Sequence, residues 1–484
     1  MRQFRPQEEV DFVIIGSGAA GGIMAKQLSM AGFSVVVLEQ GGWGKYGHEW
    51  DYNKDELLQR NISDEDRLMS NPARQRNTFR RTDREEARPG NHSYGSVVGG
   101  GTVTYGGSSW RHLPWEFNEA SHVGTMAGTG LADWPISYEE LEPYYTQAEW
   151  EMGISGQRVD SPFVAPMSKE YPVPPVPMKS SGALFYRAAA KLGLSVVPGP
   201  LAIITEGYMG RSGCVNCGMC SGYGCHVKAR SSSAVTVIPL AIETGNCEVR
   251  VRSYVREILT DNNGRVTGVT YFNAEKQEVF QNAKSVVLSA NAGESARLLL
   301  MSASNRFPDG LANSNGVVGR YLMLGGGAGA SALFEHPLND YKGVVSGTGI
   351  VDYVPSDPDR GFYGGGRMTS RGYATPISYG LGGPEPRRAP LGSGLQTGAQ
   401  GRIQTQDGDL VFHHAAAARD QSRGSGPHGE RRVGVARYAH HVHESSRRHQ
   451  EHGVLQTEVD RGSRGGRGQV CVGGSGPRQH WRCA

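Results

Sequence analysis

The chain has 484 residues, a formal net charge of +3 and 69 glycines. This length allows two or three domains with sizeable cores, and the small net charge gives no support to a nucleic-acid-binding protein. No run of about eighteen apolar residues occurs and residues 1–9 lack an apolar segment, so we expect neither a membrane span nor a secretory signal. A cytoplasmic location is the default expectation, and export with a signal-bearing partner is the alternative.

Residues 10–39 carry the pattern of a dinucleotide-binding β–α–β unit. A short β-branched run predicts a buried parallel strand, and the glycines after it allow a sharp turn close to a pyrophosphate at a helix N-terminus. A second strand ends at Glu39, whose carboxylate can accept hydrogen bonds from a ribose. The predicted cofactor contacts of this unit are Gly16, Ser17, Gly18, Ala20, Gly21 and Glu39.

Three further segments follow before residue 150. Residues 40–90 are polar, and their five arginines (Arg74, Arg76, Arg80, Arg81 and Arg84) predict a solvated excursion, with an anion site as the alternative. Residues 95–111 are too rich in glycine for a regular element, and their apolar residues argue against a linker, so we expect backbone lying against a flat ligand. Ser137 and Glu140 form a capping box, which predicts a helix start.

These motifs resemble the glucose–methanol–choline (GMC) family of FAD-dependent oxidoreductases. The chain is most similar to the branch that contains bacterial glucose, fructose and gluconate dehydrogenase large subunits. The resemblance covers roughly residues 10–325, and several independent motifs occur in family order. They are the glycines and Glu39 of the first unit, Gly99–Arg111, Trp134–Tyr138, Ser289–Leu299 and residues 313–323.

The resemblance implies an α/β fold with a Rossmann-type FAD-binding domain and a second, α+β substrate domain built on an antiparallel sheet. We place the first domain at residues 1–325, with a helical and loop excursion around 135–205, and the start of the second at 326–383. Further contacts to FAD are then expected from Gly99, Gly100, Gly101, Thr102, Val255 and Ala290.

The implied activity is oxidation of a CH–OH group of an alcohol, polyol or sugar by hydride transfer to flavin N5. Electrons would pass to an acceptor other than NAD, through an electron-transfer subunit or a cytochrome. Some members attach FAD to a histidine where this chain has Thr104, which predicts non-covalent FAD. The chain also departs from the family at Tyr105, where many members have asparagine, and at residues 324–326, where Asp-His-Pro is common.

Cys214, Cys217, Cys220 and Cys225 form a dense cluster of thiols. Thiolates are the usual ligands of iron–sulfur clusters, so the cluster is a candidate metal site. Its spacing is not the ferredoxin pattern, and structural thiols or a local disulfide are the alternatives.

Residues 384–484 differ from the rest of the chain, with no lysine and fifteen arginines. Neither helical nor strand periodicity persists, so we expect no packed elements in this atypical tail. Translation out of frame of a GC-rich gene would explain the composition; a divergent domain and an arginine-rich arm are the alternatives. Because no catalytic histidine of the family finds a counterpart, the catalytic residues are unknown, and a catalytically inactive flavin-binding remnant is the alternative function.

Overall fold

The computed structural model describes the chain from residue 3 onward with gaps. The described residues are 3–44, 78–79, 85–86, 88–89, 94–124, 130–218, 220–322, 329–334, 338–344, 347–357, 359, 364–371 and 406–414. By its contacts the chain falls into two units, Met1–Tyr438 and Ala439–Ala484, and every described residue belongs to the first. The five arginines of the predicted excursion and residues 324–326 lie outside the described residues.

A six-stranded sheet in the order β6-β2-β1-β9-β8-β7 forms the first layer of the fold. β1 pairs in parallel with β2 on one side and with β9 on the other, and β2 pairs in parallel with β6. The predicted α/β, Rossmann-type class is confirmed. The strands are β1 (Val10–Ile15), β2 (Val35–Leu38), β6 (Cys247–Arg250), β7 (Tyr254–Thr260), β8 (Val266–Phe272) and β9 (Glu278–Leu288).

β9 is long enough to belong to two parts of this sheet. Its first half pairs antiparallel with β8, which pairs antiparallel with β7, and its second half pairs in parallel with β1. Since successive side chains of a strand point to opposite faces, each face of the sheet receives its own apolar set. Ile14 packs with residues of one core cluster, and its neighbours Val13 and Ile15 pack in another.

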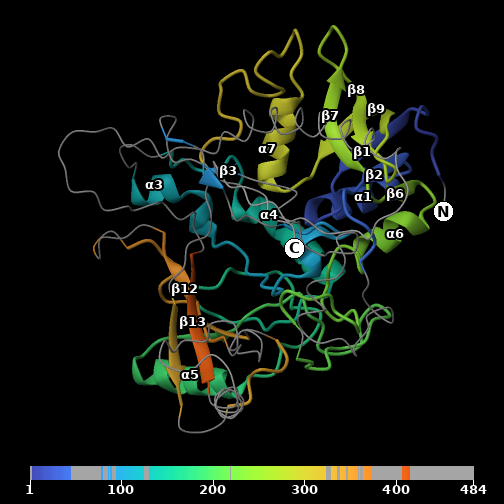
Figure 1. Ribbon diagram of the computed structural model, residues 1–484. Helices are drawn as coiled ribbons and strands as arrows, with labels where there is room; N and C mark the ends of the chain where they lie inside the picture. Colours follow the sequence, from blue (N-terminus) through green and yellow to red (C-terminus); the bar gives the residue numbers. More distant parts are fainter. Residues whose placement is uncertain are drawn as a thin grey trace, which may run out of the picture. The chain divides into compact units, whose positions relative to one another are not determined.

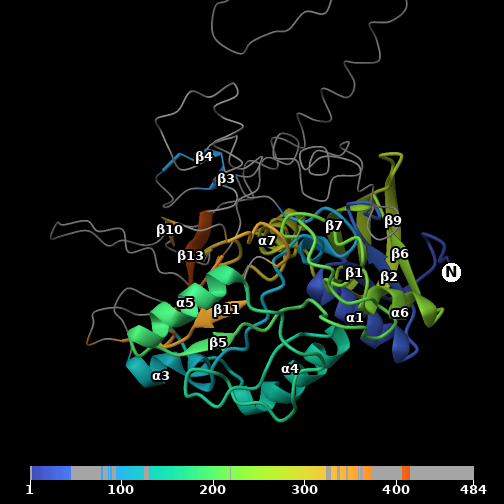
Figure 2. The same ribbon diagram turned by 90° about the horizontal axis from the view of Figure 1, so that it is seen from below.

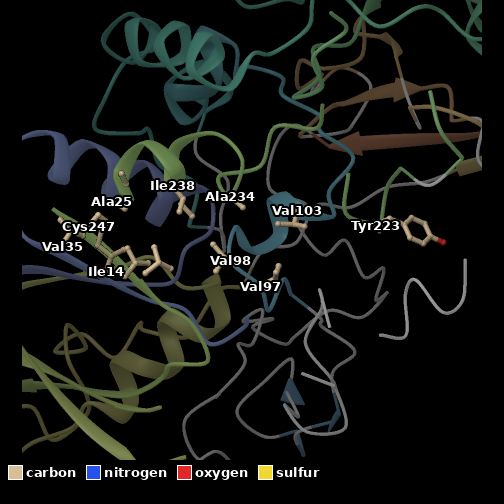
Figure 3. Packing of buried hydrophobic residues seen from close by; sticks show 13 residues of the cluster. Ile14, Ala25, Val35, Val97, Val98, Val103, Tyr223, Ala234, Ile238 and Cys247 are labelled. Atoms are coloured by element: carbon tan, nitrogen blue, oxygen red, sulfur yellow. The ribbon is translucent and has the colours of Figure 1, made fainter. Parts of the chain in front are cut away.

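Helices cover both faces of the parallel strands. α1 (Ala19–Met30) and α6 (Val237–Glu243) contact each other closely, and Ala25 and Ile238 from them join Ile14 in one core (Figures 1 and 3). α7 (Ala292–Met301) packs on β7, and its Leu298 joins the opposite core. This layered arrangement leaves the carboxyl ends of β1, β2 and β9 at one common edge.

A second sheet of five antiparallel strands follows the order β10-β13-β12-β11-β5. Figure 2 shows α5 (Ser180–Lys191) beside β5 and β11, and a Cβ at Gly182 would lie 3.0 Å from Thr348 Oγ1. The expected antiparallel sheet is therefore present, and one of its strands comes from residues 196–198. Its strands are β5 (Val196–Pro198), β10 (Gly329–Leu333), β11 (Thr348–Ile350), β12 (Gly366–Thr369) and β13 (Gln406–His414).

The expectation that residues 384–484 form no element is wrong at β13. This strand pairs with β10 through Gly329↔Val411 and with β12 through Gly366↔His414. Two neighbouring strands supply its ladder hydrogen bonds, and such long-range pairing leaves no local signal in the segment itself. The rest of this tail lies outside the described residues.

The helix predicted from the capping box is confirmed as α4 (Tyr138–Met152). Ser137 Oγ accepts a hydrogen bond from Glu140 N–H, and Glu140 Oε2 accepts one from Ser137 N–H. None of the described helices is long and apolar enough to cross a membrane. The remaining short elements are β3 (Thr78–Phe79), β4 (Arg88–Pro89), η2 (Gly100–Val103), η3 (Pro114–Phe117) and α3 (Glu119–Val123).

Candidate flavin site

A cavity of about 520 Å³ opens where β1, β2 and β9 end. Ligands of open α/β sheets bind at this edge, and the volume lies within the range of cofactor sites. The cavity is lined by Ile15, Gly16, Ser17, Gly18, Ala19, Ala20, Leu38, Glu39, Gln40, Tyr94, Gly95, Gly100, Gly101, Thr104, Ser253, Tyr254, Val255, Ser289, Ala290, Asn291, Glu294, Arg297 and Leu298.

The turn between β1 and α1 depends on glycine at two positions. Gly16 has φ +94°, and a Cβ there would lie 2.6 Å from Ser289 O. A Cβ at Gly21 would lie 2.0 Å from Gly16 O, so Gly21 allows helix and strand to pack closely. Gly18 caps α1 without a side-chain hydrogen bond, and its Cβ position has no atom within 4 Å. The N-terminus of α1 therefore faces the cavity, and its free N–H groups are accessible to an anionic group.

Glu39 connects the end of β2 with this turn. Its carboxylate accepts hydrogen bonds from Ser17 N–H at 3.1 Å and Ser17 Oγ–H at 2.6 Å, and from Gly41 N–H at 3.0 Å. Glu39 is only 4% exposed. Burial raises the pKa of its carboxyl above the usual range, while the hydrogen bonds from Ser17 and Gly41 act in the opposite direction.

The glycine-rich loop closes over the same turn. Gly99 N–H donates to Ser17 Oγ at 3.1 Å, and a Cβ at Gly100 would approach Gly18 Cα to 3.0 Å. Thr102 Oγ1–H donates to Gly99 O at 2.5 Å and accepts from Ser233 N–H at 3.1 Å. The loop thus lies with its backbone directly against the first helix turn, as expected for a cover over a flat ligand.

Nine of the twelve predicted cofactor contacts line the cavity. They are Gly16, Ser17, Gly18, Ala20, Glu39, Gly100, Gly101, Val255 and Ala290. Gly21, Gly99 and Thr102 lie behind this wall, where they support the turn and the loop. The direct contact of each residue with a cofactor stays a prediction.

Charged and aromatic side chains that the sequence did not single out complete the wall. Arg297 lies with Cζ 5.2 Å from the ring centroid of Tyr254, and its Nε–H donates to Glu294 Oε2 at 2.8 Å. Tyr94 lines the same wall. Tyr254 directly precedes Val255, and Glu294 and Arg297 belong to the motif of residues 289–299 that contains Ala290. Proximity to these predicted contacts was the one sequence signal for the three residues, and Tyr94 had no such signal.

The structure does not support the candidate iron–sulfur site. Cys214, Cys217, Cys220 and Cys225 are all free cysteines, and no group of three or more potential ligands forms a metal site among the described residues. Burial raises the pKa of the Cys220 thiol to about 11 and that of Cys214 in the same direction. Since all four cysteines are free, structural thiols rather than a local disulfide match the structure among the alternatives.

The segment that carries the four cysteines, residues 214–225, instead contacts the glycine-rich loop. Gly222 N–H donates to Thr104 O at 2.7 Å, and Arg230 Nη1 donates to Tyr105 O at 2.8 Å and to Cys220 O at 2.9 Å. These hydrogen bonds connect the cysteine-containing segment to the glycine-rich loop beside the cavity.

Comparison with known proteins decides the family. The model of GMC oxidoreductases matches residues 10–324, which include every predicted cofactor contact. The chain belongs to the GMC oxidoreductase family. The predicted family is therefore confirmed.

Three related GMC proteins have curated names. The chain is 34% identical over 383 residues to 2-methyl-1,2-propanediol dehydrogenase of Mycolicibacterium austroafricanum, which covers 76% of this chain and 64% of that protein. It is 31% identical to the gluconate 2-dehydrogenase flavoprotein of Pantoea cypripedii, covering 74% and 63%, and 29% identical to the fructose dehydrogenase large subunit of Gluconobacter japonicus, covering 72% and 64%. The chain thus spans just under two thirds of these relatives.

Solved structures show the same GMC fold. Pyridoxine 4-oxidase from Mesorbium loti superposes with a TM-score of 0.53 at 18% identity, covering 93% of this chain and 81% of that one. Formate oxidase superposes with a TM-score of 0.51 at 13% identity, covering 84% and 73%.

The cavity wall fits the FAD that this family binds. Gly18 leaves open space at an uncapped helix N-terminus, which suits a diphosphate, and the buried Glu39 carboxylate lines the same cavity and suits ribose hydroxyls.

Proposed function

We propose that this GMC protein is an FAD-dependent dehydrogenase of an alcohol, polyol or sugar. The observation that carries the proposal is the cavity of about 520 Å³ with Glu39 and the uncapped start of α1 in one wall. Bound FAD would supply the hydride acceptor for an adjacent C–H bond. The α1 N-terminus would hold the diphosphate, and Glu39 would accept hydrogen bonds from the ribose.

We infer that FAD is held non-covalently. Thr104 lines the cavity at the position where some family members carry the histidine that bonds to FAD. A threonine hydroxyl is a weak nucleophile at neutral pH and offers no such attachment.

The substrate class rests on the relatives. The three named above are dehydrogenases of a diol, a sugar acid and a sugar, which favours a hydroxylated carbon compound here as well. One of them is a large subunit, so we also propose an electron-accepting partner for this chain.

Reconstitution tests this proposal. Purified protein incubated with FAD and then desalted should keep flavin absorbance, and acid precipitation should release all of it because no covalent bond forms. Anaerobic addition of diols, sugars and sugar acids one at a time should bleach the flavin bands with at least one of them. Folded protein that takes up no FAD would contradict the assignment.

The alternative of an inactive flavin-binding remnant gives a different result in the same experiment. It predicts FAD uptake with no bleaching by any member of the panel, while dithionite still reduces the bound flavin. Sequencing the gene through codons 380–400 adds an independent check, since an intact frame would end the out-of-frame explanation of the tail.

A further inference from the structure

A second, small cavity lies against the five-stranded sheet, away from the residues that line the flavin cavity. Its volume is about 20 Å³, which is room for one water-sized particle. Arg367 of β12 and Trp110 both line it, together with Tyr171 and Gln157.

Arg367 is a buried cation without a matching anion. Its residue is 8% exposed, and its Nε is buried with no hydrogen-bond partner. Its contacts are a long hydrogen bond from Nη2 to Arg111 O at 3.4 Å and stacking of Cζ 4.8 Å from the Trp110 ring centroid. No carboxylate of the described residues forms an ion pair with it. Burying an unpaired charge costs several kcal/mol, so an anion bound beside Arg367 would stabilise the folded protein.

The nearby acids are already engaged. Glu142 and Glu149 pair with Arg111 at 2.9 and 2.6 Å. Burial lowers the pKa of the Arg367 guanidinium, and the charge of Glu116 acts in the opposite direction. The carboxylate of Glu116, however, accepts a hydrogen bond from Leu113 N–H at 2.5 Å and lies 3.3 Å from His112 Nδ1. Arg111 thus has two ion-pair partners, whereas Arg367 has none among the described residues.

A second donor lines the cavity. Tyr171 lines the cavity, and burial raises the pKa of its hydroxyl, so this hydroxyl is a donor at neutral pH. The ring of Tyr171 packs closely against Gly156, where a Cβ would lie 2.5 Å from the ring. Arg367 and Tyr171 thus line the same cavity, and each carries a hydrogen-bond donor that an acceptor bound there could use.

We propose that this cavity binds one monovalent anion of halide size between Arg367 and Tyr171. The small volume of the cavity favours a single small ion over a carboxylate or a phosphate, and the unpaired guanidinium favours an anion over a neutral water. The bound anion would neutralise Arg367 and fix the Arg367–Trp110 stack. The site is separate from the proposed flavin chemistry.

Thermal unfolding of the full chain tests this site. Sodium bromide should raise Tm with the logarithm of its concentration above Kd, by about 2 °C at ten times Kd, relative to sodium methanesulfonate of equal ionic strength, whose anion is larger than the proposed ligand. Arg367→Met should abolish this difference, whereas Arg265→Met, at an exposed arginine, should keep it. Equal bromide dependence in all three proteins would overturn the proposal.

A crystal of the unaltered protein keeps the test decisive if Arg367→Met fails to fold. Grown with bromide, it should show an anomalous scattering peak in the cavity within about 3.5 Å of Arg367 Nε. Density for a water without anomalous signal would overturn the proposal.

Discussion

Single residues decide how the flavin cavity is shaped and charged. Gly18 leaves open space in the wall, whereas Gly16 and Gly21 leave none for a side chain. Glu39 places a buried carboxylate in the same wall. Substitutions at these two positions test cofactor binding, because Gly18→Ala meets no neighbouring atom and Glu39→Gln keeps the size of the side chain.

Gly18→Ala should weaken FAD binding at least about tenfold while Tm of the FAD-free protein stays within about 1 °C. The added methyl meets no atom within 4 Å but projects beside the helix N-terminus that would hold the diphosphate. Fluorescence titration of FAD measures the affinity. Gly130→Ala, where a Cβ also meets no atom within 4 Å, lies outside the cavity wall and should bind FAD normally. Equal affinities would argue against a diphosphate at α1.

Glu39→Gln should weaken FAD binding about 10- to 100-fold, because an amide replaces a charged acceptor of ribose hydrogen bonds. The same titration measures this loss. Glu243→Gln changes an exposed acid at the end of α6 and serves as the control. If both variants bind FAD like the unaltered protein, the ribose does not lie at Glu39.

At the scale of elements, the close contact of α1 with α6 holds the cavity wall. Gly22 of α1 faces the start of α6, and a Cβ there would lie 2.7 Å from Ser233 Cβ and 3.1 Å from Val237 Cγ2. Ser233 Oγ–H in turn donates to Ser17 O at 2.9 Å. Helix packing and the first turn are therefore linked through one serine.

Gly22→Leu should lower the free energy of unfolding by roughly 1–3 kcal/mol, because the larger side chain overpacks this helix contact. Urea unfolding followed by circular dichroism measures the change. Gln27→Leu places leucine at an exposed position of the same helix and should cost less than about 0.5 kcal/mol. A Gly22→Leu protein as stable as this control would mean that the two helices are not in close contact.

At the scale of the whole molecule, Arg111 and Glu142 join segments that are distant in the chain. Arg111 follows the glycine-rich loop, and Glu142 of α4 accepts from its Nη1 at 2.9 Å and from Ser168 N–H at 2.9 Å. Burial raises the pKa of the Glu142 carboxyl, but the bonds from Arg111 and Ser168 outweigh it and hold the pKa at about 2.

Glu142→Gln should therefore change stability in a pH-dependent way. A carboxyl whose folded pKa lies below its unfolded value stabilises the fold above about pH 4.5, and this stabilisation is lost as the pH falls towards 2. The variant should be less stable by about 1–2 kcal/mol at pH 7, and the difference should shrink below pH 4. Urea unfolding at pH 3, 5 and 7 measures it. Glu139→Gln, at an exposed acid of α4, should show no such trend; a constant deficit for Glu142→Gln would contradict the mechanism.

The sequence by itself determined the first β–α–β unit with five residues of the cavity wall, and the start of α4. The family resemblance supplied four further wall residues, Gly100, Gly101, Val255 and Ala290. The first unit and the start of α4 depend on local patterns: strand runs such as residues 10–15, glycines required for a tight turn, and a capping box at Ser137 and Glu140. Each is specified within a few residues, because backbone conformation and helix capping are short-range effects.

Only the tertiary structure decided the rest. β13 forms because β10 and β12 offer it hydrogen bonds, and Arg297 enters the cavity wall because α7 packs on β7. The four clustered cysteines looked like metal ligands in the sequence, yet no group of three or more potential ligands comes together among the described residues. The uncompensated charge of Arg367 is likewise invisible in the sequence. Burial and pairing between distant residues set these properties, and no local pattern encodes them.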